Sequence, residues 1–167
     1  MDLWIARHGP NDLDGETYLD RERALTPRGI KHVVAVAAQL KIDGQAPKGI
    51  FTSVFKRTMQ TADIIGKTLN SRVIPCDEVG PEVPLCSFFC KLFETQNSGM
   101  MMVGHHTNIA SFLSEYGDGQ APDILACGEV RRYSVDSSGC LQIAYRITPA
   151  DVGMPDMITL RNILSIG

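Results

Sequence analysis

The sequence predicts an α/β fold: a single three-layer α/β/α sandwich with a mostly parallel sheet and an antiparallel strand or hairpin near the C-terminus. Two observations carry this prediction. Short apolar segments alternate with segments of helical periodicity from residue 3 to residue 116, which is typical of parallel strands joined by crossover helices. Two loosely alternating segments then flank a short polar turn at residues 136–139, which indicates a hairpin.

The first half of the chain contains two strand–helix pairs followed by a third strand. A strand is expected over residues 3–6, and a polar surface loop over residues 10–24. The first helix begins after Thr26, a good N-cap, with Pro27 in the first helical position, and it ends at the breakers within residues 43–47. The elements expected next are a strand at 49–53, a helix at about 55–69 and a strand at 72–75.

The second half ends in the predicted hairpin. The elements expected are a loop at 76–84, a helix at 85–95, a central strand at 100–103, a helix at 107–116, and hairpin strands at 130–135 and 140–147. No linker or repeat interrupts the chain, so residues 1–167 are predicted to form one domain. No element is assigned to residues 148–167, which we treat as its C-terminal tail.

Composition excludes several classes of protein. With 44% hydrophobic and 21% charged residues, the chain is typical of a folded domain rather than a disordered one. Its net charge of -3 argues against nucleic-acid binding, and no apolar run approaches the roughly 20 residues of a membrane span. No signal peptide is recognisable and the five cysteines include no Cys-x-x-Cys pair, so we expect reduced thiols in a cytoplasmic protein.

Three of the predicted strand ends carry residues that suggest chemistry. Arg7 and His8 follow the first strand, Arg57 lies in the first turn of the second helix, and His105 follows the central strand. Because parallel strands end at one edge of the sheet, these four side chains can converge there. Two guanidinium groups, two imidazoles and adjacent helix N-termini make a cationic pocket suited to phosphate. Each residue alone would more commonly be structural or solvated, so the prediction depends on the combination.

These segments resemble the histidine phosphatase superfamily, also called the phosphoglycerate-mutase-like family. Arg7-His8-Gly9 matches the family's Arg-His-Gly segment, and Leu25-Thr26-Pro27-Arg28-Gly29 matches its Leu-Thr-x-x-Gly phrase. Residues 53–62 match its Ser-Pro-x-x-Arg-x-x-Gln-Thr-Ala phrase, except that Val54 replaces the proline. Val103-Gly104-His105 matches its Val-Gly-His phrase. The four motifs occur in the family's order, which makes the resemblance specific.

The resemblance implies phosphoryl transfer through a phosphohistidine intermediate. His8 would attack phosphorus as a neutral imidazole, and water would then hydrolyse phospho-His8. Arg7, Arg57 and His105 would hold the phosphoryl oxygens and stabilise the charge of the transition state. No metal or other cofactor is implied, because side chains supply the positive charge.

Residues beside these four are further candidates. Gly9 leaves room for a close backbone turn and, with Asn11, is a candidate phosphate ligand. His106 is an alternative to His105, although the Gly-His match favours His105. Asn11 and Asn108 could also donate hydrogen bonds to phosphate, but asparagine at such positions is more commonly a local cap.

The general acid is not fixed by the sequence. Family members that cleave alkyl phosphates use a carboxylate to protonate the leaving oxygen. Glu82 fits that position best within the loop that also holds Asp77 and Glu78, and Asp12 in the first loop is the other candidate. The remaining alternative is that these carboxylates are simply solvated and that no acid is used.

The short chain most resembles the SixA-type phosphohistidine phosphatases of this family. It lacks length for insertions that would cover the pocket, so an open site that admits a phosphohistidine on another protein is expected. An imidazole leaving group would also demand less of an acid than an alkoxide would. The expected partner is therefore a phosphorylated protein of the histidine-phosphotransfer type, or else a small phosphate ester; no nucleic acid, membrane or oligomeric state is implied.

Two other functional classes are compatible with the same residues. One is a general small-molecule phosphomonoesterase of the family, which would need Glu82 or Asp12. The other is a phosphate-binding regulatory module of low activity, which the Val54 substitution suggests. A metal hydrolase built on His8, His105 and His106 is disfavoured, because carboxylate ligands at suitable spacing are missing and the arginines would repel a cation.

Overall fold

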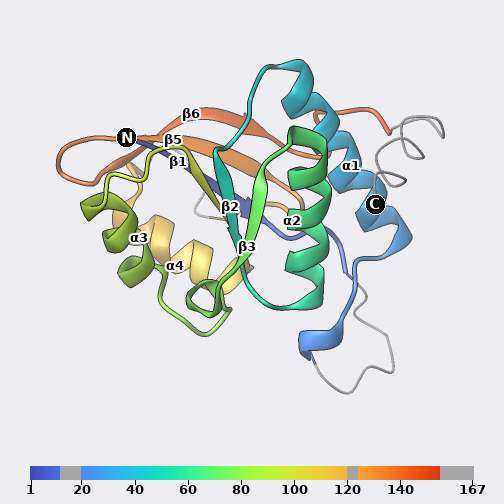
Figure 1. The fold of residues 1–167 in the computed structure, drawn as a ribbon, viewed down its shortest axis with the longest axis horizontal. Coiled ribbons are helices and arrows are strands. Elements are labelled where there is room, and N and C mark those ends of the chain that lie inside the picture. The colour runs from blue at the N-terminus through green and yellow to red at the C-terminus, as the bar shows by residue number, and fades with distance from the viewer. Residues whose placement is uncertain (12–19, 120–123, 155–167) are drawn as a thin grey trace.

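A six-stranded sheet forms the centre of the computed structural model, which describes residues 1–11, 20–119 and 124–154 (Figure 1). The strands are β1 (Asp2–Arg7), β2 (Gly49–Thr52), β3 (Arg72–Pro75), β4 (Met100–Gly104), β5 (Val130–Val135) and β6 (Leu141–Ile147). Their order across the sheet is β3-β2-β4-β1-β5-β6. Strands β1 to β4 pair in parallel, whereas β5 is antiparallel to both β1 and β6. The mostly parallel sheet and its C-terminal hairpin are confirmed.

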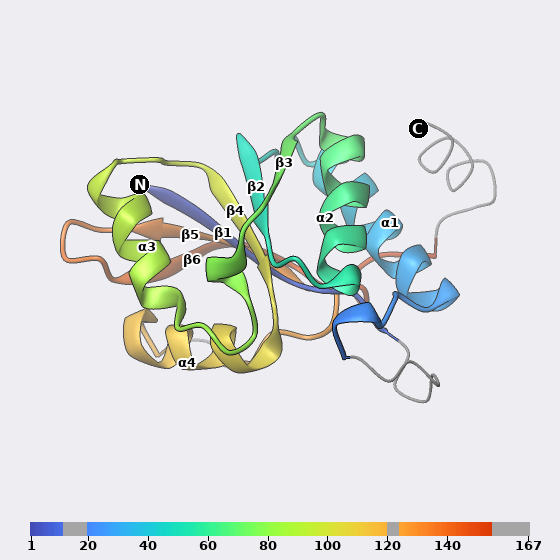
Figure 2. The same ribbon diagram turned by 60° about the horizontal axis from the view of Figure 1, so that its bottom comes forward.

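In the described part of the chain, four α-helices cover the two faces of the sheet (Figure 2). They are α1 (Pro27–Ile42), α2 (Lys56–Leu69), α3 (Leu85–Glu94) and α4 (His106–Tyr116). Successive strand residues point to opposite faces, and β1 shows the consequence. Trp4 and Ala6 pack in the apolar cluster beneath α1 and α2, whereas Leu3 and Ile5 pack in the cluster beneath α3 and α4. The predicted α/β/α layering is therefore correct.

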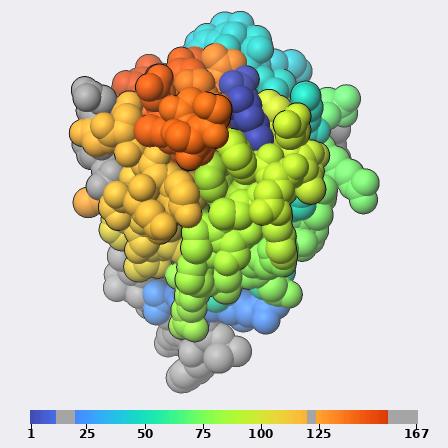
Figure 3. Space-filling model, turned by 90° about the vertical axis from the view of Figure 1, so that its left-hand side faces the viewer, coloured from blue at the N-terminus to red at the C-terminus, as the bar shows by residue number. Residues whose placement is uncertain are grey.

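The N-terminal strand is held from both sides. The Met1 ammonium donates to the Val135 carbonyl at 2.9 Å, and Val135 N–H donates back to Met1. On the other side, Gly99 N–H donates to the Asp2 carbonyl. Figure 3 shows the N-terminus lying between the β5–β6 hairpin and the segment that leads into β4. Hydrogen bonds on both sides therefore fix the position of β1 in the sheet.

The N-terminus of α1 is tied to the segment that follows His8. As predicted, Thr26 is the N-cap, and its Oγ1 accepts the Gly29 N–H at 2.9 Å. Thr26 N–H in turn donates to the Pro10 carbonyl at 3.1 Å. A Cβ on Gly29 would lie 2.0 Å from that carbonyl oxygen, so a larger residue would separate the two segments.

The main departures from the predicted elements are two short 3₁₀ turns, Asp20–Glu22 and Asp77–Val79, which lie in segments expected to be irregular. Three residues are too few to show a helical period, so composition alone could not reveal them. The predicted tail begins with a turn in which Thr148 N–H and Oγ1 both donate to Asp151. Its residues 155–167 lie outside the described residues. The single-domain boundary at 1–167 stays a prediction.

None of the described helices is long and apolar enough to cross a membrane.

Candidate active site

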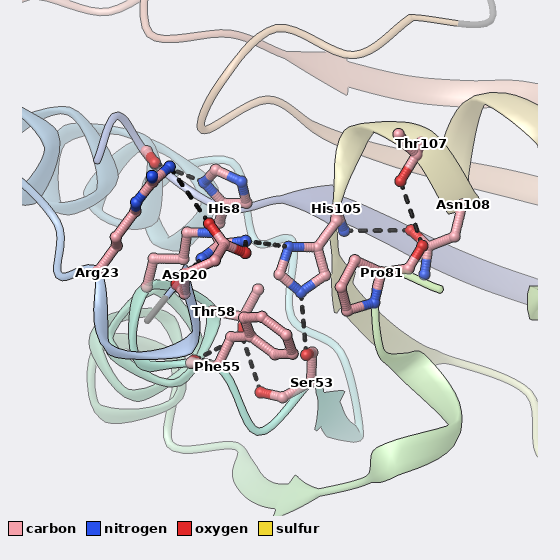
Figure 4. Close-up of polar contacts among 12 residues, drawn as sticks. His8, Asp20, Arg23, Ser53, Phe55, Thr58, Pro81, His105, Thr107 and Asn108 are labelled. Atoms are coloured by element: carbon pink, nitrogen blue, oxygen red, sulfur yellow. Dashed lines mark hydrogen bonds and ion pairs between the residues drawn. The ribbon is translucent and has the colours of Figure 1, made fainter. Parts of the chain in front are cut away.

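Three parallel strands end level with one another and place their following residues together. In the sheet Arg7 pairs with Gly104, and Thr52 pairs with Val103. His8 N–H then donates to the Gly104 carbonyl at 3.1 Å, and Ser53 N–H donates to Val103 at 3.2 Å. The segments after β1, β2 and β4 are therefore fixed side by side, and their side chains meet beyond the sheet edge (Figure 4).

His8 is buried and held in one orientation. Only 7% of the residue is exposed, and its Nδ1 lies 2.8 Å from the Gly9 carbonyl oxygen. A carbonyl can only accept, so Nδ1 carries the proton and Nε2 keeps its lone pair. Burial lowers the pKa of His8 to about 4, with the charges of Arg57 and Arg7 acting in the same direction. At neutral pH the ring is therefore an uncharged base with a free Nε2.

His105 faces His8 edge-on, with 5.5 Å between the ring centroids. Arg57 Nη2 lies 3.2 Å from its Nδ1, and Ser53 Oγ lies 2.9 Å from its Nε2. A guanidinium can only donate, so Nδ1 accepts and the Nε2 proton goes to Ser53. Burial, then the Arg57 charge, lowers the pKa of His105 to about 3. This ring is also neutral at pH 7.

Arg57 lies in the first turn of α2 and is 6% exposed. Its Nη1 donates to the Asp20 carbonyl at 2.7 Å, and its Nη2 donates to Asp20 Oδ2 at 2.9 Å. The guanidinium lies 4.9 Å from the centre of the Phe55 ring, which also packs edge-on against His105. Aromatic packing and the Asp20 contacts thus hold the guanidinium beside the two histidines.

Arg7 is held from the β5 side of the site. Its Nη1 donates to the Leu125 carbonyl at 2.7 Å. Its Nε is buried and has no hydrogen-bond partner within the part of the chain that the structure describes. A buried donor without a partner is costly, unless a ligand supplies the missing acceptor. The two guanidinium groups, with two neutral rings beside them, can therefore hold a small oxyanion.

Comparisons with known proteins agree with this geometry. Residues 3–79 match the family model of the histidine phosphatase superfamily (branch 1). These residues are therefore similar to that superfamily, and the comparisons support a phosphatase. It is 25% identical over 167 residues to phosphohistidine phosphatase SixA of Escherichia coli strain K12, covering 95% of this chain and all of that protein.

Solved structures show the same fold. A structure of the protein histidine phosphatase SixA complexed with tungstate superimposes with a TM-score of 0.80 at 23% identity, covering 90% of this chain and 99% of that one. The crystal structure of a putative alpha-ribazole-5'-P phosphatase from Escherichia coli superimposes with a TM-score of 0.70 at 16% identity, covering 93% and 99%. The fold is therefore shared by phosphatases that are named for different substrates.

Gly9 and Asn11 have local structural roles beside the site. Gly9 N–H donates to Thr61 Oγ1 at 3.1 Å, and a Cβ on Gly9 would lie 2.6 Å from Val33 Cγ2. The glycine is thus required where the backbone passes close to α1, and its amide is already engaged rather than free for phosphate. Asn11 forms an isolated β-bridge with Leu25, which closes the base of the first loop.

Glu82 is not brought into contact with the two histidines. It is exposed and lines a cavity of about 200 Å³ between its loop and α4, and neither His8, Arg57 nor His105 lines that cavity. Asp12, the other acid candidate, lies outside the described residues. The described residues thus place neither predicted acid at the reacting centre.

Asn108 and His106 occupy the first turn of α4. Asn108 Oδ1 accepts the His105 N–H at 3.3 Å, and its amide donates to the Gly80 carbonyl at 2.7 Å. Asn108 thus acts as a local cap that ties the loop before α3 to His105, with Thr107 reinforcing this tie through Pro81. His106 is half-buried, and its Nδ1 has no partner among the described residues. It is His105, not His106, that meets Arg57.

Asp20 and Ser53 are site residues that sequence reasoning missed. Asp20 contacts Arg57 and also pairs with Arg23, whose Nη1 lies 3.3 Å from Oδ1. It comes from a loop without periodicity, where nothing distinguishes it from neighbouring acids. Ser53 belongs to the matched motif, but only the structure shows that it is buried beside His105.

Among the described residues, no group of three or more His, Cys, Asp or Glu could hold a metal ion.

Proposed function

We propose that this chain removes phosphoryl groups from phosphohistidine side chains of proteins, with His8 as the nucleophile. The observation that carries the proposal is the state of the His8 ring. Its Nδ1 proton is committed to the Gly9 carbonyl and its pKa is lowered to about 4 by burial, so Nε2 is unprotonated and oriented at neutral pH. An anion-binding pocket with such a nitrogen favours phosphoryl transfer over mere binding.

The reaction would proceed in two displacements. Nε2 of His8 attacks phosphorus while the bond between phosphorus and the substrate's imidazole nitrogen breaks, and that nitrogen takes the electron pair. Arg7 and Arg57 hold the three phosphoryl oxygens, and His105 Nδ1 accepts from Arg57 and so helps to orient its guanidinium. Water then attacks phospho-His8 and releases phosphate. Catalysis is mostly positioning and electrostatic stabilisation, as is usual for phosphoryl transfer.

Phosphohistidine is favoured as the substrate for two reasons. Of the relatives described above, the one with the highest identity bears the name phosphohistidine phosphatase, and the structure of a SixA was obtained with tungstate, an oxyanion. In addition, an imidazole is a better leaving group than an alkoxide, which suits a site with few carboxylates near the nucleophile. The partner would be a phosphorylated protein of the histidine-phosphotransfer type.

The test compares wild type with His8→Ala, in the presence of a chelator. One substrate is a histidine-phosphotransfer domain carrying ³²P-phosphohistidine, and the other is 4-nitrophenyl phosphate. We expect rapid, His8-dependent loss of label from the protein, together with an alkali-stable, acid-labile label on the wild-type enzyme during turnover. His32→Ala is the matched control, because His32 lies on α1 and its ring contacts the exposed Arg28 rather than any residue of the site.

Two results would contradict the proposal. Equal turnover by wild type and His8→Ala would remove His8 as the nucleophile. Turnover of the aryl ester with no loss of label from the transfer domain would replace phosphohistidine by small esters. The second result is a specific alternative, since Asp20 places a carboxylate where an alkoxide leaving group could be protonated.

A further inference from the structure

The site contains one carboxylate that neither the motifs nor the mechanism above uses. Asp20 Oδ2 lies 2.9 Å from Arg57 Nη2, and the same nitrogen lies 3.2 Å from His105 Nδ1. Asp20 reaches this place from a separate segment, at the 3₁₀ turn before α1. Figure 4 draws the Asp20 side chain in the region between the rings of His8 and His105. We propose that Asp20 is the general acid–base of this enzyme, an inference that rests on the proposed function.

The accessibility of Asp20 suits that role. Its side chain is 53% exposed, whereas that of Arg57, to which it is bound, is 7% exposed. Asp20 Oδ2 is fixed by the Arg57 guanidinium and Oδ1 lies 3.3 Å from Arg23 Nη1, yet about half of the side chain stays open to solvent, where a leaving group can reach it. Both His8 and His105 are nearly buried. Among the described residues, Asp20 is the acid that combines contact with the phosphoryl clamp and access from outside.

Substrate and Asp20 would meet at the same guanidinium. Arg57 gives one N–H of each Nη to Asp20, so an incoming phosphoryl group shares this guanidinium with the carboxylate. The leaving atom and the Asp20 carboxyl are thereby brought close together. A proton that Asp20 takes from solvent can then pass directly to the leaving atom.

The proton and electron pairs balance over both steps. In the first, the bond to the leaving atom breaks, its electron pair stays on that atom, and the Asp20 proton is transferred to it. Asp20 is left as a carboxylate. In the second, that carboxylate takes a proton from the attacking water, the phosphorus–Nε2 bond breaks, and its electron pair returns to His8. The enzyme ends with His8 neutral and Asp20 protonated, ready to exchange with solvent when phosphate departs.

The experiment is a leaving-group series with Asp20→Asn. The substrates are the phosphate esters of 2,4-dinitrophenol, 4-nitrophenol and phenol, in order of increasing leaving-group basicity. Because an acid matters only for basic leaving groups, Asp20→Asn is expected to lower kcat/KM for phenyl phosphate about 10²–10³-fold and to leave the dinitrophenyl ester within a few-fold. Asp20→Glu, which keeps a carboxyl group, should restore part of the loss.

Glu22→Gln is the matched control. Glu22 is an exposed acid in the same 3₁₀ turn, and this change should leave all three rates unaltered. An equal loss for all three esters in Asp20→Asn would reduce Asp20 to a group that positions Arg57. An equal gain, with tighter inhibition by inorganic phosphate, would make it only a competitor for Arg57. Either result overturns the inference.

The proposed function and this inference fail in different ways. If wild type hydrolyses none of the esters and no label appears on His8, the phosphatase mechanism itself is wrong. If wild type is active and forms phospho-His8, but Asp20→Asn shows no dependence on the leaving group, only the role of Asp20 is wrong. The urea midpoint of each variant, measured in parallel, shows whether a loss of rate comes from unfolding.

Discussion

Two buried clusters of charge lie on either side of β1, and they differ in how their charges are matched. On the β5 side, Glu129 is 0% exposed and accepts from Arg131 Nε at 2.7 Å, Arg146 Nε at 2.6 Å and Ala126 N–H at 2.7 Å. Burial opposes ionisation there, yet these hydrogen bonds hold the pKa of Glu129 below its usual range. This cluster is closed, with its carboxylate fully coordinated by the protein.

In the cluster at the strand ends, the positive charges outnumber the carboxylates that pair with them. Among the described residues, Arg7, Arg57, His8 and His105 are accompanied by one carboxylate in an ion pair with them, that of the half-exposed Asp20. The low pKa values of the two histidines keep both rings neutral, so they do not add charge to the two arginines. The Glu129 cluster, whose charges are paired within the protein, stabilises the fold. The cluster at the strand ends has more positive charge than negative charge and is therefore suited to binding an anionic ligand.

Breaking the closed cluster should have the largest effect on stability. Glu129→Gln keeps the shape but removes the charged carboxylate that pairs with Arg131, which is 1% exposed. We expect the free energy of unfolding to fall by about 3–5 kcal/mol, measured from urea titrations at pH 7. The exposed Glu94→Gln is the control. A loss as small as that of the control would mean that Arg131 finds other partners and that the cluster is not closed.

The residues at the strand ends (Arg7, Arg57, His8, His105 and Asp20) form what we call the open cluster. Breaking it should lower the reaction rate much more than the stability. Arg57→Met removes a donor to the phosphoryl group, so kcat/KM should fall about 10²–10³-fold on any substrate that wild type turns over. Stability should change little, because Asp20 is half-exposed and becomes solvated when its partner is lost. The same urea titration and a rate assay separate the two effects. A large loss of stability with a modest loss of rate would place Arg57 among the structural charges.

The two histidines should make stability depend on pH between about 4 and 6.5. The pKa of His8 is about 4 in the folded protein against an ordinary value of 6.5, so the unfolded chain binds more protons in this window. Stability is fully present above pH 6.5 and is lost as the pH falls. His8 alone should contribute about 2 kcal/mol of loss at pH 5 relative to pH 7, by the linkage relation.

The measurement is the urea midpoint of wild type and His8→Asn across this range. The difference between the two should grow in favour of the variant as the pH falls, because asparagine does not titrate. Ring proton signals of His8 should also show no titration midpoint near its ordinary pKa of 6.5. If the urea midpoints of the two proteins change with pH in parallel, His8 is protonated like an exposed histidine. The argument that His8 is a neutral nucleophile would then be wrong.

The open cluster was far easier to predict from the sequence than the closed one. Its members follow strands and lie in motifs, so topology alone brings His8, Arg57 and His105 to one edge. Arg131 lies inside β5, where a charge in an alternating strand normally indicates the solvent face, yet it is fully buried. Its burial depends on Glu129 two residues away and on the Ile124 carbonyl, and neither contact has a sequence signature.

The general acid that we propose, Asp20, could not be predicted from the sequence for a similar reason. Periodicity and motifs locate elements, but they carry no information about which loop side chain folds back onto a given arginine. The family pattern favours Glu82 by its position, whereas the structure places Asp20 on Arg57 from another loop. Local turn geometry decides this, through a 3₁₀ turn too short to detect.

The smallest effect that we predict concerns the orientation of His105 in the open cluster. Ser53→Ala removes the acceptor of its Nε2 proton at a site where Ser53 is 0% and His105 is 3% exposed. An unsatisfied buried donor should cost about 1–3 kcal/mol of stability. The rate should fall less than tenfold, because Arg57 still fixes Nδ1. Ser111→Ala, which removes an exposed bond to Thr107, is the control. If Ser53→Ala instead slows turnover as much as Arg57→Met while stability is unchanged, then Ser53 contacts the phosphoryl group itself, and the open cluster has one more member than we assign.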